Sequence, residues 1–144
     1  MWIIFALGAS MLWGLTYTLS EKIYAKISIP TSLGISSVVS GLGILLFAWI
    51  MGLIGRDIAT LAGSAKLSRM LIAETIALAL AEISVGMAIA TKNATLAGMV
   101  EISYPIFIGL FTYLIFRESH VNTSVYIGGL LIFTGVFVIY YFNR

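Results

Sequence analysis

The sequence has no cysteine, one histidine and two prolines, and only 10% of its 144 residues are charged. Without cysteine the chain forms no disulfides and offers no thiolate metal ligands. A soluble domain of this size needs far more charge to cover its surface, so a water-soluble catalytic domain is excluded. The net charge of +2 is small and is spread between the apolar runs, which gives no support for nucleic-acid binding.

Hydrophobic residues make up 60% of the chain and gather in runs about as long as the ~20 residues that cross a bilayer. The fold class we predict is all-α, an integral membrane bundle of five transmembrane helices in a single domain, residues 1–144. The helices are expected at about residues 2–19, 31–54, 69–90, 94–116 and 123–142. The first run is interpreted as a retained helix, because no basic segment precedes Trp2 and the run is long for a signal peptide.

Several polar residues mark where the helices begin. Pro30 suits a first helical turn, and the hydroxyls of Thr31 and Ser32 can cap it. Asn93 and Asn122 each begin a match to the glycosylation pattern, but both coincide with predicted helix starts, where asparagine is a good cap. We interpret both as caps. Residues 56–68 are the longest polar connector.

Five spans place the two termini on opposite faces of a membrane. One side would carry Lys22, Lys26, Lys92 and Arg144. The other would carry Arg56, Lys66, Arg69 and Arg117. With four basic residues on each side, the positive-inside rule gives no preferred orientation. A balanced count fits a protein that inserts in both orientations.

Two carboxylates fall inside predicted spans. Counted from Lys92, Glu82 and Glu101 each lie about 13 to 15 Å deep at a rise of 1.5 Å per residue, in adjacent antiparallel helices. An ionised carboxylate at that depth is costly. A proton shared by the pair, or exchanged for a cationic group, is a plausible coupling device. The alternative is that each is protonated and hydrogen-bonds to a neighbouring helix as packing only.

Pro105 adds to the interest of Glu101. A proline cannot donate to the carbonyl four residues earlier, which here belongs to Glu101. Unsatisfied backbone at this depth is tolerated where it lines a cavity or packs into protein. The break, the carboxylate and the neighbouring Tyr104 therefore predict one site, with a simple kink as the alternative.

Trp13, Tyr17 and Glu21 follow one another at four-residue spacing and share a stripe on the first helix. Trp13 and Tyr17 are candidates to line a substrate path, although such stripes are more often packing or interface residues. Lys22 either reaches back into a cavity or sits at the interface. Near the start of the third span, Glu74 is expected to snorkel or to pair with Arg69.

No catalytic set is recognisable. His120 lies in a connector and is expected to be solvated, and no nucleophile, base and acid arrangement or metal cluster can be built around it. We therefore expect no enzyme activity, no cofactor and no metal.

The chain resembles a single repeat of the drug/metabolite transporter superfamily, in particular the EamA-type domain. The resemblance is most specific near the C-terminus, where Pro105 of Ser103-Tyr104-Pro105-Ile106-Phe107 is followed by Glu118, Gly128, Leu131-Ile132 and Gly135-Val136. Trp13-Gly14 and Lys22 are similar to the family's opening.

The resemblance implies one five-helix half of a ten-helix inverted-repeat fold. Most members join two such repeats in one chain and move metabolites or drugs, so a single repeat must pair to complete a pathway. An antiparallel homodimer would satisfy this. The chain departs from the pattern at Glu82 and Glu101, which do not belong to it, and the second helix lacks an arginine often seen there.

We predict a secondary transporter of small metabolites or drug-like compounds that works as a homodimer by alternating access, with proton coupling as one option. Its partners would be a second copy, the lipid bilayer and a small-molecule substrate, and its location the plasma membrane. The substrate or coupling site would comprise Glu82, Glu101, Tyr104, Pro105, Trp13 and Tyr17. Two alternatives stay open: a non-transporting membrane subunit, and a flippase for lipids or lipid-linked sugars.

Overall fold

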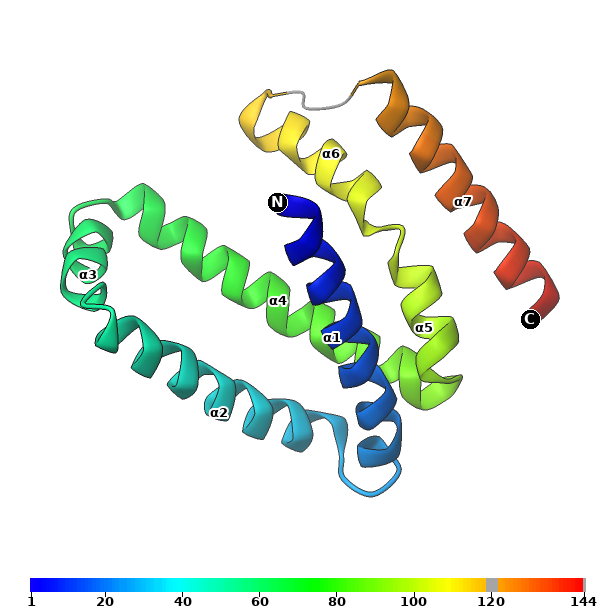
Figure 1. Ribbon diagram of the computed structural model, residues 1–144, viewed down its shortest axis with the longest axis horizontal. Coiled ribbons are helices and arrows are strands. Elements are labelled where there is room, and N and C mark those ends of the chain that lie inside the picture. The colour runs from blue at the N-terminus through cyan, green and yellow to red at the C-terminus, as the bar shows by residue number, and fades with distance from the viewer. Residues whose placement is uncertain (119–121, 144) are drawn as a thin grey trace. The chain divides into compact units, whose positions relative to one another are not determined.

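The computed structural model describes residues 1–118 and 122–143, and in these residues it consists of helices joined by short turns, without strands. The described part contains seven helices (Figure 1): α1 Trp2–Tyr24, α2 Ile29–Ile50, α3 Ile54–Ala62, α4 Ala65–Thr91, α5 Ala94–Glu101, α6 Tyr104–Phe116 and α7 Thr123–Asn143. The predicted all-α class is confirmed.

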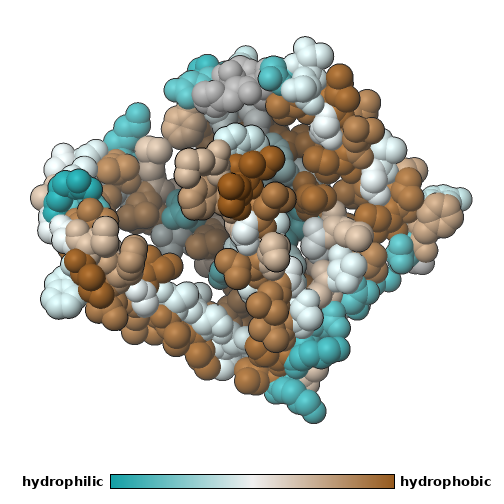
Figure 2. Space-filling model, viewed as in Figure 1, coloured by the Kyte–Doolittle hydropathy of each residue, from teal (hydrophilic) through white to brown (hydrophobic). Residues whose placement is uncertain are grey.

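Five spans in the described residues are long and apolar enough to cross a membrane: α1, α2, α4, α7 and the combined span Ala94–Phe116, which contains α5 and α6. They are 21 to 27 residues long, which at 1.5 Å per residue gives roughly 32 to 41 Å, enough to cross a hydrocarbon core of ~30 Å. Large apolar side chains on these helices are exposed, and Figure 2 shows apolar residues over most of the visible surface. Such a surface suits lipid rather than water.

The helix ends differ in places from the prediction. α1 continues to Tyr24, so Glu21 and Lys22 belong to its last turns. Pro30 lies in the first turn of α2, as predicted, but the position before that helix is held by Ser28, whose side chain makes no capping hydrogen bond. The Ser28 hydroxyl donates instead to the Thr31 hydroxyl at 2.9 Å. The proline, rather than a hydroxyl cap, therefore accounts for this helix start.

The connector predicted as polar contains the short helix α3. Ile54, Ile58 and Leu61 recur at spacings of four and three residues, which places them on one face of α3. Arg56 and Asp57 lie off this face and form an exposed ion pair at 3.1 Å. α3 is therefore amphipathic, with its apolar side chains on one face.

The chain divides into two compact units, Met1–Glu21 with Ala88–Arg144, and Lys22–Met87. In the second unit, α4 approaches the start of α2 closely: a β-carbon added at Gly86 would lie 2.7 Å from Cγ2 of Ile29 and 3.5 Å from the Tyr24 ring. Only glycine leaves room for this approach.

In the first unit, α5 contacts α7. The Lys92 ammonium, in the turn before α5, donates to the carbonyl of Asn143 at 3.1 Å. A cation at the C-terminal end of α7 is favourable because the last carbonyls of a helix carry partial negative charge. The turn before α5 is thereby tied to the end of α7.

Candidate functional site

The fourth span is two helices with a break between them. α5 ends at Glu101 and α6 begins at Tyr104, and Figure 1 shows the non-helical link that joins them. The Ser103 amide donates to Val100 O at 3.2 Å, and the Ile106 amide to Ser103 O at 3.1 Å, so three-residue turns replace the α-helical ladder. Pro105 lies between Ser103 and Ile106, in the first turn of α6, and has no amide hydrogen to restore that ladder.

Glu101 faces α1 from this break. The phenolic hydroxyl of Tyr17 donates a hydrogen bond to Oε2 of Glu101, across 84 residues of sequence. Both side chains are half-buried. A carboxylate that accepts such a bond inside a membrane span has part of its desolvation cost offset.

Gly98, one turn before Glu101, lets α5 approach the Tyr17 ring. A β-carbon at this position would lie 3.3 Å from Cδ2 and 3.6 Å from Cε2 of Tyr17. The ring therefore packs on the α5 backbone, and its hydroxyl reaches the end of the same helix.

The beginning of α5 is also held by α1. The Ala94 amide donates to Oε2 of Glu21 at 2.7 Å, while the Asn93 side chain accepts from the Leu96 amide at 2.8 Å. The first amides of a helix have no partner within it, and a carboxylate there is favoured by the helix dipole. The predicted Asn93 cap is confirmed.

The other predicted cap is confirmed as well. Oδ1 of Asn122 accepts from the Val125 amide at 3.1 Å and from the Ser124 hydroxyl at 2.7 Å. Both asparagines are thus used within the chain at helix starts, as the sequence predicted.

α1 and α5 run antiparallel where they meet, because Glu21 contacts the first residue of α5 and Tyr17 contacts the last. Trp13 lies a further turn back on the same stripe. Its ring centroid is 5.7 Å from that of Tyr17, with the planes tilted by 58°. The stripe on α1 therefore presents two aromatic rings and a carboxylate along one line.

Of the six predicted site residues, the structure brings together Trp13, Tyr17 and Glu101 by direct contacts. Tyr104 and Pro105 begin α6 on the far side of the break, and both are exposed. Glu82 is half-buried in α4 and belongs to the unit Lys22–Met87. His120 lies outside the described residues.

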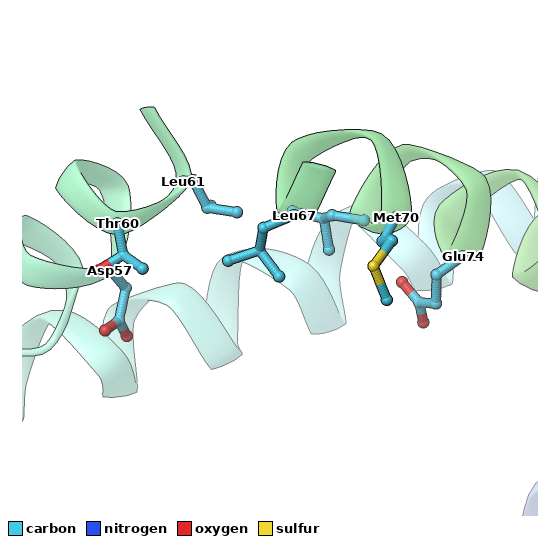
Figure 3. Close-up of a pocket in the computed structure, with 7 residues that line it drawn as sticks. Asp57, Thr60, Leu61, Leu67, Met70 and Glu74 are labelled. Carbon is cyan, nitrogen blue, oxygen red and sulfur yellow. The ribbon is translucent and has the colours of Figure 1, made fainter. Parts of the chain in front are cut away.

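Glu74 lies in a different setting. Together with residues of α3 and α4 it lines an open groove of about 530 Å³; the other lining residues are Asp57, Thr60, Leu61, Leu67, Met70 and Leu71. Figure 3 shows Asp57 and Glu74 at opposite ends of this mainly apolar surface. The Arg69 guanidinium, expected near Glu74, donates through Nε to Ala65 O at 3.2 Å.

Sequence reasoning missed two contributors to the site, Glu21 and Gly98. The four-residue spacing placed Glu21 on the stripe with Tyr17, but nothing local indicated that its partner is the Ala94 amide, 73 residues away. Gly98 gave no signal among the 14 glycines of the chain.

Five apolar spans, one of them interrupted beside a carboxylate, define a polytopic membrane protein with the discontinuous helix that transporters use. The chain belongs to the EamA-like transporter family, whose model matches residues 1–141. This agrees with the resemblance to the drug/metabolite transporter superfamily and makes the chain a member of a family of small-compound transporters. No curated protein and no solved structure matches it.

Proposed function

We propose that this protein is a secondary transporter of small metabolites or drug-like compounds, which works in the plasma membrane as an antiparallel homodimer by alternating access. Glu101 is the coupling group, binding either a proton or a cationic part of the substrate. Tyr17 and Trp13 line the path to it, and Tyr104 lines the path on the α6 side of the break.

The hydrogen bond from Tyr17 to Glu101 at the end of α5 carries the proposal. A carboxylate within a membrane span is costly unless it has a partner or a function. Here it sits where the helix stops, and discontinuous helices in transporters place ligands at such breaks. The aromatic rings of Trp13 and Tyr17 add the apolar and cation-attracting surface that an organic cation requires.

The break also supports alternating access. Residues Ile102 and Ser103 join two helices that are each regular, and motions of transporters are concentrated at a few such positions between rigid elements. α6 can therefore change its angle to α5 while α5 stays packed on α1.

The antiparallel homodimer rests on the sequence rather than on a contact. The described residues hold an odd number of spans, so two copies inserted in opposite orientations would reproduce an inverted repeat. The four-to-four distribution of basic residues permits this. Glu82, in the unit Lys22–Met87, is the second carboxylate to which this proposal assigns a coupling or cation-binding role.

The test is uptake by liposomes that contain the purified protein, with a pH gradient across the membrane. Tetraphenylphosphonium is the first probe, because it combines a positive charge with aromatic groups. Glu101→Gln should lower gradient-driven uptake about tenfold or more, since tenfold corresponds to ~1.4 kcal/mol. Glu74→Gln, another carboxylate within an apolar span, is the matched control and should leave uptake unchanged.

A neutral amino acid with an aromatic side chain and a cationic amino acid extend the set of probes. Uptake of any probe that responds to the gradient and is unaffected by Glu101→Gln would overturn the role of Glu101. If no probe moves, and the protein purifies only with a second chain in fixed ratio, the alternative of a non-transporting subunit is favoured instead.

A further inference from the structure

Glu21 contacts the half-helix that carries Glu101, yet it lies at the opposite end of that helix. α5 is 8 residues long, from Ala94 to Glu101, or roughly 12 Å at 1.5 Å per residue. Glu21 accepts from the Ala94 amide at the first end, and Tyr17 donates to Glu101 at the second. Two side chains one turn apart on α1 thus hold both ends of α5.

A half-helix this short depends on outside contacts. Isolated helices below ~12 residues are marginal even in favourable sequences, and α5 cannot continue into α6 because the ladder stops at the break. The orientation of α5 therefore depends on its contacts with neighbouring helices. Two of these contacts are the hydrogen bond from the Ala94 amide to Glu21 and the packing of Gly98 against the Tyr17 ring.

We infer that Glu21 is a positioning residue, which fixes α5 against α1 and so aligns the carboxylate of Glu101 with the hydroxyl of Tyr17. The inference rests on the proposed role of Glu101 as the coupling group. In this arrangement α1 and α5 move as one body, and the motion of the transport cycle occurs beyond Glu101, at Ile102 and Ser103.

Asn93 gives a natural comparison within the same helix end. Its side chain caps the Leu96 amide, but both residues belong to the α5 segment, so this bond stabilises α5 without tying it to α1. Glu21 supplies a similar bond from a different helix. Capping and positioning are therefore assigned to different residues and can be separated by substitution.

Two conservative variants test separately the length and the charge of the Glu21 side chain. Glu21→Gln keeps the length of the side chain and an oxygen that accepts from the Ala94 amide, but removes the charge. Glu21→Asp keeps the charge but is shorter by one methylene, so it cannot make the 2.7 Å contact without movement of α1 or α5. The inference requires that Glu21→Gln preserves the Tyr17 to Glu101 bond and that Glu21→Asp weakens it.

The measurement is infrared difference spectroscopy of the purified protein in lipid. In each background the spectrum of the matching Glu101→Gln protein is subtracted, which isolates the carboxyl band of Glu101. Tyr17→Phe gives the reference position for the lost hydrogen bond. Glu21→Asp should move the band toward that reference, whereas Glu21→Gln and Asn93→Ala should leave it at the wild-type position.

The spectrum needs no substrate, so its outcome is independent of whether the protein transports the probes. A band that stays in place in Glu21→Asp overturns the inference. An equal shift of the band in Asn93→Ala also overturns the inference, because any loss of capping at the start of α5 would then be sufficient to disturb Glu101. A shift of the band in Glu21→Gln would show that the hydrogen bond between Tyr17 and Glu101 depends on the charge of Glu21 rather than on its side-chain length. This would contradict positioning by the Ala94 contact. If Glu21→Asp does not fold, Glu21→Ala replaces it with the same expected shift.

Discussion

The ring of Tyr17 lies against Gly98, with 3.3 Å between the ring atom Cδ2 and the place that a β-carbon of residue 98 would occupy. Tyr17 thereby contacts α5 twice, since its hydroxyl also donates to Glu101 one turn later. The size of residue 98 therefore controls how close the two helices come, and the hydrogen bond depends on that approach.

Enlarging residue 98 should separate α5 from Tyr17. Gly98→Ala requires a shift of a few tenths of an ångström, whereas Gly98→Val overpacks the contact at a cost of ~1–3 kcal/mol. We expect a lower Tm in detergent for the valine variant and a larger loss of uptake than for alanine. Gly8→Val is the control, because nothing lies within 4 Å of a β-carbon at Gly8. Equal effects at the two positions would contradict the close approach.

Replacing Pro105 should partly restore helical hydrogen bonding at the break between α5 and α6. Pro105→Ala supplies an amide that can donate to the Glu101 carbonyl, so residues 102–106 should gain protection from hydrogen exchange. Uptake should fall because the link at Ile102 and Ser103 becomes less flexible, while the Tm of the protein stays equal or rises. Pro30→Ala is the control, since Pro30 already lies in a first helical turn, where proline costs little. Unchanged exchange at residues 102–106 would show that the break does not depend on the proline.

The close contact of Gly86 with Ile29 predicts that substitutions at these two positions have non-additive effects on stability. Gly86→Ala would place its β-carbon 2.7 Å from Cγ2 of Ile29, and the branched side chain of Ile29 has little freedom to turn away. We expect destabilisation of ~1–3 kcal/mol. Ile29→Ala removes the clashing methyl group, so the double variant should be less destabilised than the sum of the single ones, as measured by Tm in a double-mutant cycle. Additive effects would argue against the contact.

The orientation in the membrane can be tested directly because the chain has no native cysteine. A cysteine added after Arg144 is labelled with an impermeant thiol reagent before and after the membrane is opened. About half of the protein should be labelled before opening and all of it afterwards, since the balanced basic residues set no preference. Labelling of all or none of the intact sample would show one fixed orientation, and an antiparallel homodimer would then be ruled out.

Much of the fold could be predicted from the sequence, because the spans and helix caps depend on residues that are close together in the chain. Apolar runs of sufficient length predicted the five spans, and Asn93 and Asn122 were assigned as caps from their own neighbours. α3 was not predicted, although Ile54, Ile58 and Leu61 carry a helical spacing. A helix of 9 residues is too short to stand out from a polar connector by pattern alone.

The sequence by itself determined that the chain is a membrane protein with five spans, and that the fourth carries a carboxylate beside a proline, because length, hydropathy and the missing proline donor act within one segment. Only the tertiary structure decided which partners those groups have. Tyr17 meets Glu101 across 84 residues, and Glu21 meets Ala94 across 73. In a membrane span many helix pairs satisfy the same hydropathy pattern, so the choice among them is made by close packing at a residue such as Gly98 and by the need to satisfy polar groups.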